Sequence, residues 1–171
     1  MRKSKISISG FKIGTAENRE GLTGVTVILA PDGGATAGVD VRGCAPGTRE
    51  TDLLDPRKTV QKIHAVVLSG GSAFGLEAAS GCVKYLAEQG VGFPIGNVCV
   101  PIVCSAVLFD LMIGDEKAYP DLLMGYEAAK SASSEFLSGC NGAGTGATVG
   151  KLLGFGNAMK SGAGYHEISL P

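Results

Sequence analysis

Short apolar and β-branched runs, separated by glycine-containing turns, dominate the first part of the chain. Residues 5–8 alternate polar and apolar positions and residues 24–30 are rich in β-branched side chains, so both are predicted to be strands. Residues 31–34 combine proline with two glycines and predict a turn, after which residues 35–41 should return as the second strand of a hairpin. The nearly unbroken apolar run at residues 63–68 predicts a strand buried on both faces.

A helical pattern follows over residues 73–89. Ser72 is placed to cap this helix and Gly90 to end it. Four apolar residues recur at helical spacing on one face, namely Leu76, Ala79, Val83 and Leu86.

The second half of the chain contains fewer clear elements. Residues 98–111 are predicted to form a strand that is interrupted at Pro101, although residues 105–111 are also compatible with a helix. Pro120 fits the first position of a helix that continues to residue 131. Residues 165–170 are predicted to be a final strand, which would leave an unpaired edge, as in part of a larger domain.

Length and charge narrow the class of protein. At 171 residues the chain has the size of one domain, and 44% apolar residues with 18% charged residues exclude wholesale disorder. Fifteen basic residues balance 16 acidic ones, so no basic surplus favours nucleic-acid binding. No apolar run approaches the ~18 residues of a membrane span.

Cysteine and glycine usage adds two further limits. The five cysteines form no C-x-x-C pair and the two histidines lie far apart, so neither a disulfide framework nor a zinc site is expected. This cysteine usage fits the reducing cytoplasm. The 27 glycines lie within otherwise apolar segments, a pattern typical of tight turns and close backbone contacts.

The glycine-rich segment at residues 139–150 is followed by Lys151 and invites comparison with a phosphate-binding loop. Thr145 stands where a P-loop requires glycine, and Leu152 stands where it requires Ser or Thr. The pattern therefore fails twice. A tight chain crossing remains possible, as does a loop beside a catalytic centre with Lys151 pointing into it.

Ser72 follows a predicted strand and two glycines, as the serine of a nucleophile elbow does. Phe74 replaces the last glycine of that motif, and helix capping is the simpler interpretation. The backbone N–H groups of Gly70, Gly71 and Ser72 suit an anion or oxyanion. A compact serine hydrolase would combine Ser72 with His166 and either Asp110 or Asp115.

Six segments together carry a family resemblance. In this order they closely resemble peptidase family P1 (S58), which contains the L-aminopeptidase/D-amidase-esterases, the β-aminopeptidases and the nylon-oligomer hydrolases. The segments are residues 40–54, 65–76, 92–94, 101–103, 106–110 and 142–151.

The resemblance implies an α+β fold, part of the four-layer αββα sandwich of N-terminal nucleophile hydrolases. Family members are precursors of about twice this length that cleave themselves before a Ser or Thr. That residue then attacks amide or ester carbonyls of small peptides, amino-acid amides or related oligomers. Homo-oligomers are expected, and neither a metal nor a cofactor.

On this interpretation residues 1–171 are a single, incomplete domain that lacks the nucleophile-bearing second segment. The resemblance assigns Lys151 a role in supporting the nucleophile and places Phe109 where relatives have an oxyanion-hole tyrosine. The alternatives are a non-catalytic degenerate member and the hydrolase that uses Ser72. The expected substrate and oxyanion vicinity comprises Gly70, Gly71, Ser72, Phe74, Phe109, Asn141, Gly142 and Gly144.

Overall fold

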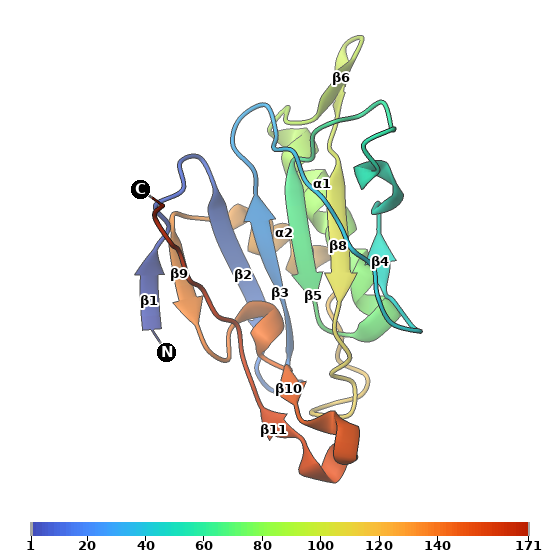
Figure 1. Ribbon diagram of the computed structural model, residues 1–171, viewed down its shortest axis with the longest axis vertical. Coiled ribbons are helices and arrows are strands. Elements are labelled where there is room, and N and C mark those ends of the chain that lie inside the picture. The colour runs from blue at the N-terminus through green and yellow to red at the C-terminus, as the bar shows by residue number, and fades with distance from the viewer. Residues whose placement is uncertain (1, 171) are drawn as a thin grey trace.

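A mixed sheet of five strands forms the centre of the computed structural model, which describes residues 2–170 (Figure 1). Its strand order is β2-β3-β5-β8-β4. The strands are β2 (Lys12–Asn18), β3 (Thr23–Leu29), β5 (Ala65–Ser69), β8 (Val103–Val107) and β4 (Thr48–Arg49).

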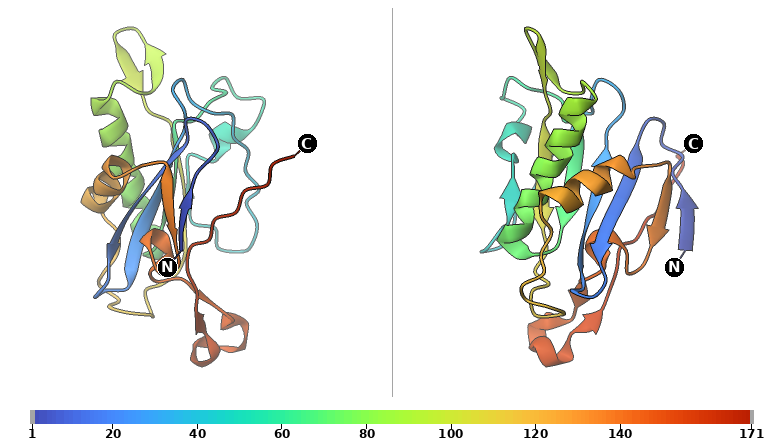
Figure 2. Two further views of the ribbon diagram at one scale, coloured as in Figure 1. Left: turned by 90° about the vertical axis from the view of Figure 1, so that its left-hand side faces the viewer. Right: turned by 180° about the vertical axis from the view of Figure 1, so that it is seen from behind.

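Two helices cover one face of this sheet, as the view from behind in Figure 2 shows. Helix α1 (Ala78–Glu88) lies on the connection between β5 and β8, which are parallel; the other pairings are antiparallel. Helix α2 (Leu122–Lys130) packs across α1 and over β2 and β3. The sheet therefore has one covered face and one open face.

Three two-stranded ribbons flank the central sheet. β1 (Arg2–Lys5) pairs with β9 (Glu135–Ser138), β6 (Phe93–Ile95) pairs with β7 (Val98–Val100), and β10 (Thr148–Val149) pairs with β11 (Met159–Lys160). Residues 2–170 also contain five 3₁₀ turns: Asp52–Leu54, Ser72–Glu77, Gly142–Gly144, Lys151–Leu153 and Phe155–Asn157.

Alternation along the central strands separates the two faces. On β3, Val25 and Val27 are fully buried under the helices, whereas Thr26 and Ile28 point to the open face. On β5, Val67 is buried and Leu68 is 39% exposed. The prediction of a strand buried on both faces was therefore wrong, because the helices cover only one side of β5.

The predicted hairpin of residues 24–30 and 35–41 was also wrong. The turn itself is confirmed by the hydrogen bond from Gly34 N to Pro31 O at 2.9 Å. After the turn, however, Ala35 exchanges hydrogen bonds with Ile63, and β3 instead pairs with β2 and β5. The strand at residues 12–18 was missed because its polar and small residues give it no strong hydrophobic alternation.

Both predicted helix starts need correction. Ser72 has a φ of +53° and opens a 3₁₀ turn without a capping hydrogen bond from its side chain, and α1 begins only at Ala78. Pro120 lies one residue before the true cap of α2, Asp121, whose carboxylate accepts a hydrogen bond from Met124 N at 2.8 Å. The helix end at Gly90 is confirmed by its φ of +68° and its bond to Ala87 O at 3.0 Å.

The interruption at Pro101 is confirmed, because β7 ends at Val100 and β8 begins at Val103. Residues 165–170 form no strand. The predicted strand at residues 5–8 is displaced, since β1 ends at Lys5.

The structure confirms a mixed α+β fold. Of the four layers implied by the family resemblance, residues 2–170 contain one sheet layer and one helix layer. Within the same residues, no helix combines the length and the hydrophobicity needed to cross a bilayer.

The contact between α1 and α2 provides a test of this packing. A Cβ atom at Gly81 would overlap the carbonyl oxygen of Leu122, so Gly81→Ala should lower the free energy of unfolding by about 2 kcal/mol despite the better helix propensity of alanine. Gly38→Ala is the control, because nothing lies within 4 Å of that position. Equal urea midpoints for the two variants would contradict this packing.

Candidate functional site

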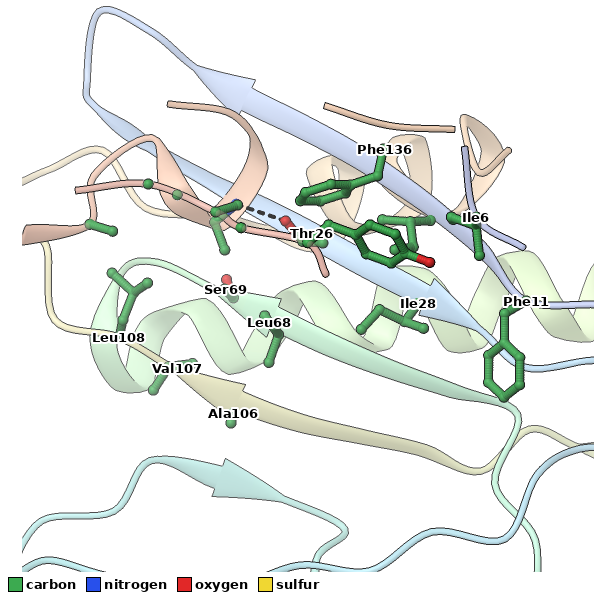
Figure 3. Close-up of a pocket in the computed structure, with 18 of the residues that line it drawn as sticks. Ile6, Phe11, Thr26, Ile28, Leu68, Ser69, Ala106, Val107, Leu108 and Phe136 are labelled. Carbon is green, nitrogen blue, oxygen red and sulfur yellow. Dashed lines mark hydrogen bonds between the residues drawn. The ribbon is translucent and has the colours of Figure 1, made fainter. Parts of the chain in front are cut away.

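A cavity of about 500 Å³ lies on the open face of the sheet (Figure 3). Its floor comes from β3, β5 and β8, and its walls come from the N-terminal segment, β9 and the glycine-rich segments near residues 144 and 162. The larger side chains that line it are Ile6, Ile8, Phe11, Ile13, Ile28, Leu68, Val107, Leu108, Phe136 and Tyr165.

The cavity lining is almost wholly apolar. Among residues 2–170, the side-chain hydroxyls that line it belong to Thr26, Ser69 and Tyr165, and no carboxylate, imidazole, thiol or amine joins them. Thr26 Oγ1 accepts a hydrogen bond from Ala143 N at 3.1 Å, and Ser69 Oγ donates to Gly70 O at 3.1 Å. The lining can bind an apolar group, but it holds no pairing of a nucleophile with a base.

The glycine-rich segment forms one wall through Ala143, Gly144 and Ala147. Backbone donors of this segment are engaged within the protein: Gly142 N donates to Glu17 Oε2 at 3.3 Å, and Gly144 N donates to Asn141 O at 3.0 Å. The segment is therefore a tight chain crossing beside the cavity, not a phosphate-binding loop.

Of the residues that the sequence singled out, Gly144 alone lines the cavity in the described part of the chain. Asn141 is 5% exposed, and its amide donates to Thr15 Oγ1 at 3.1 Å, which fastens the glycine-rich segment to β2. Phe74 lies outside the cavity, where its exposed ring stacks on Tyr119 with centroids 4.7 Å apart.

Two predicted site residues, Lys151 and Phe109, do meet. Lys151 Nζ donates to Phe109 O at 3.3 Å, and the Phe109 ring packs against Phe155. Phe109 directly follows Leu108, which lines the cavity, so this pair lies near its rim. The functional roles that the family resemblance assigns to these two residues remain predictions.

Asp110, predicted only as a possible member of a serine triad, is buried. Its side chain is 2% exposed, Oδ1 accepts from Gly71 N at 2.6 Å, and Oδ2 accepts from Thr23 Oγ1 at 2.8 Å. A Cβ atom at Gly70 or Gly146 would overlap Oδ2. The Asp110 carboxylate thus joins the start of β3 to the turn after β5 and packs against the glycine-rich segment at Gly146.

These contacts overturn the prediction that residues 70–72 offer free N–H groups to an anion. Gly70 N donates to Gly24 O, Gly71 N donates to Asp110 and Ser72 N donates to Leu108 O. Nor does a serine triad assemble: within residues 2–170 no hydrogen bond joins Ser72 to Asp110, Asp115 or His166.

The five cysteines fall into an exposed group and a buried group, and no cysteine is among the cavity-lining residues described. Cys44, Cys99 and Cys140 are exposed, whereas Cys82 and Cys104 are buried. Burial raises the pKa of the Cys82 thiol to about 12, and burial together with the nearby Glu50 charge raises that of Cys104. No group of three His, Cys, Asp or Glu residues that could hold a metal ion occurs in the described residues.

Comparison with known proteins identifies the family. The family model described as Peptidase family S58 matches residues 6–163. The chain belongs to peptidase family S58. An uncharacterized aminopeptidase of Mycobacterium tuberculosis is 47% identical to this S58 chain over 131 residues, 77% of the chain and 38% of the relative. A 6-aminohexanoate-oligomer endohydrolase of Paenarthrobacter ureafaciens is 36% identical over 149 residues, 86% of the chain and 39% of the relative.

Solved structures share the fold of this S58 chain. The PH0078 protein from Pyrococcus horikoshii OT3 matches with a TM-score of 0.66 and 21% identity, over 85% of the chain and 47% of that structure. A Burkholderia sp. β-aminopeptidase matches with a TM-score of 0.60 and 17% identity, over 85% and 45%. The chain spans less than half the length of each of these relatives.

The two groups of cysteines predict a labelling pattern. In the folded S58 chain at pH 8, a maleimide should modify Cys44, Cys99 and Cys140, while Cys82 and Cys104 react only after denaturation because burial keeps them protonated and inaccessible. Mass spectrometry of the labelled peptides distinguishes the groups. Labelling of Cys82 as fast as that of Cys140 would contradict the packing of α1.

Proposed function

We propose that this chain is the N-terminal portion of a self-cleaving S58 amidohydrolase or aminopeptidase. In this proposal a segment beyond the chain supplies an N-terminal Ser or Thr nucleophile, whose α-amino group serves as its base. The substrates are small peptides, amino-acid amides or esters, or related oligomers. The names of the relatives support amide hydrolysis: an aminopeptidase and an endohydrolase of 6-aminohexanoate oligomers.

The open apolar face of the sheet is the observation that carries the proposal. Ile28 and Leu68 project from this face, and Phe136 lies over it (Figure 3). Fully burying one such apolar side chain stabilises a protein by about 1.5–3 kcal/mol, so packing of a second sheet on this face would be favourable. We propose that the nucleophile-bearing segment supplies that sheet and a second helix layer, which completes an αββα sandwich.

The residues that line the cavity are consistent with a nucleophile supplied by a second segment. Its lining in residues 2–170 offers an apolar surface and a rigid glycine wall without a nucleophile–base pair. In the complete site Lys151, held on Phe109 O at 3.3 Å, would support the nucleophile from the rim. Phe109 has no hydroxyl to donate, so the oxyanion would take its donors from the second segment.

Complementation tests the proposal. The chain would be co-expressed with the C-terminal portion of the Mycobacterium tuberculosis relative, whose matched part is 47% identical to it. The chain alone should release no product from an alanyl anilide, and the purified complex should hydrolyse it. Replacing the nucleophile of the added segment by alanine should abolish the rate.

Two results would contradict the proposal. Turnover by the chain alone that is lost in Ser72→Ala would favour the compact serine hydrolase. A stable complex without turnover of any amide or ester would favour a non-catalytic member of the family.

A further inference from the structure

The glycine wall of the cavity consists of two backbone segments packed directly on each other. Residues 143–147 form one and residues 162–165 form the other. Gly139 and Ala163 exchange two hydrogen bonds, both 2.8 Å long, at their junction. A Cβ atom at Gly144 would overlap Ala163 N, so no side chain fits between the two segments.

Lys160, the last residue of β11, ties these segments together. Its Nζ donates to Gly144 O at 3.0 Å, to Ala147 O at 3.0 Å and to Ser161 O at 2.8 Å. Two of these carbonyls belong to the first segment and one adjoins the second. An ammonium group has three hydrogens, so these three acceptors use its full donor capacity.

We propose that Lys160 is a positioning residue that fixes the glycine wall and thereby the shape of the cavity. Three carbonyl dipoles converge on one point, and a cation there offsets their mutual repulsion. Removing the ammonium leaves Gly144 O and Ala147 O without this partner and frees the wall to open. An effect of Lys160 on turnover rests on the proposed function, whereas its effect on the wall does not.

Lys151 provides a control that lies close to Lys160 in the sequence. It stands at the start of the loop that joins β10 to β11, whereas Lys160 ends β11. Among residues 2–170, Lys151 Nζ has a single carbonyl partner, Phe109 O, at 3.3 Å. Lys151 is the lysine that the sequence motif indicates, because the glycine-rich segment ends there. The hydrogen bonds single out Lys160 instead as the lysine that holds the wall.

Amide hydrogen exchange of the 171-residue chain tests the proposal. Lys160→Met should speed exchange in residues 139–147 and 161–165 roughly tenfold or more, the scale of one lost charge-assisted hydrogen bond. Lys151→Met should leave these amides unchanged. Equal protection of the wall in Lys160→Met and the unsubstituted chain would overturn the proposal, as would equal loss in both variants.

Chemical rescue separates the ammonium contacts from a general loss of packing. In Lys160→Ala, methylammonium chloride should restore protection of the wall because it has N–H donors for the three carbonyls. Tetramethylammonium chloride at the same ionic strength should not, since it has none. Rescue by neither salt or by both would overturn the proposal.

If Lys160→Met and Lys160→Ala do not fold, Lys160→Arg keeps the charge but presents a planar fork. It should give a smaller increase in exchange, about threefold, confined to the wall. Exchange of the wall unchanged from the parent chain in this variant would overturn the proposal.

The complemented enzyme supplies the functional readout. Lys160→Met should lower kcat/KM of the complemented enzyme at least tenfold. A complemented parent without turnover would refute the proposed function, yet the exchange experiment would still decide the role of Lys160. A complemented enzyme whose kcat/KM is unaffected by Lys160→Met would limit that role to the structure of the wall and overturn its extension to turnover.

Discussion

Close contact between backbones, at positions without a side chain, determines how each layer of this structure packs on the next. Gly81 and Gly125 bring α1 and α2 together, because a Cβ atom on either would overlap a carbonyl oxygen of the other helix. Gly14 does the same between β2 and α2. The helix residues that enter the core include small ones such as Ala78 in α1 and Ala129 in α2. This constraint accounts for the glycines that lie at contacts between elements, such as Gly14, Gly81 and Gly125.

The same constraint shapes the open side of the molecule. Gly24 lies against Gly142, and Gly144 lies against residue 163, so the glycine-rich segment fits closely over the end of the sheet. The buried Asp110 carboxylate packs against this segment at Gly146 and accepts a hydrogen bond from the turn that follows β5. These contacts build an end wall of close-packed backbone on the apolar cavity.

The sequence predicted those elements whose signal is local. The β-branched run that became β3, the break at Pro101 and the helix end at Gly90 were each predicted from neighbouring residues. The pairing of the strands was not predicted correctly. β2 carries no strong alternation of apolar and polar residues, and the turn at residues 31–34 resembles that of a hairpin. The open face of β5 could not be foreseen either, since an apolar strand reads the same whether one or both faces are covered.

Prediction of function likewise followed local sequence signals and missed contacts between distant segments. The motifs of the family resemblance correctly pointed to the S58 family, because a family match depends on residue identity. The three partners of Lys160 and the contacts of Asp110 depend on backbone atoms brought from distant segments. Backbone carbonyls and N–H groups are common to almost every residue, so no sequence motif marks where they converge.

The central claim is that the open apolar face receives the nucleophile-bearing segment of an S58 hydrolase. Methyl NMR of the labelled chain, titrated with that segment from the Mycobacterium tuberculosis relative, tests it most directly. The account predicts that the methyl signals of Ile28 and Leu68 shift on binding, while those of Val25 and Val27 beneath the helices stay nearly fixed. Binding that instead shifts only the exposed β6–β7 ribbon, or leaves Ile28 and Leu68 unchanged, would contradict it.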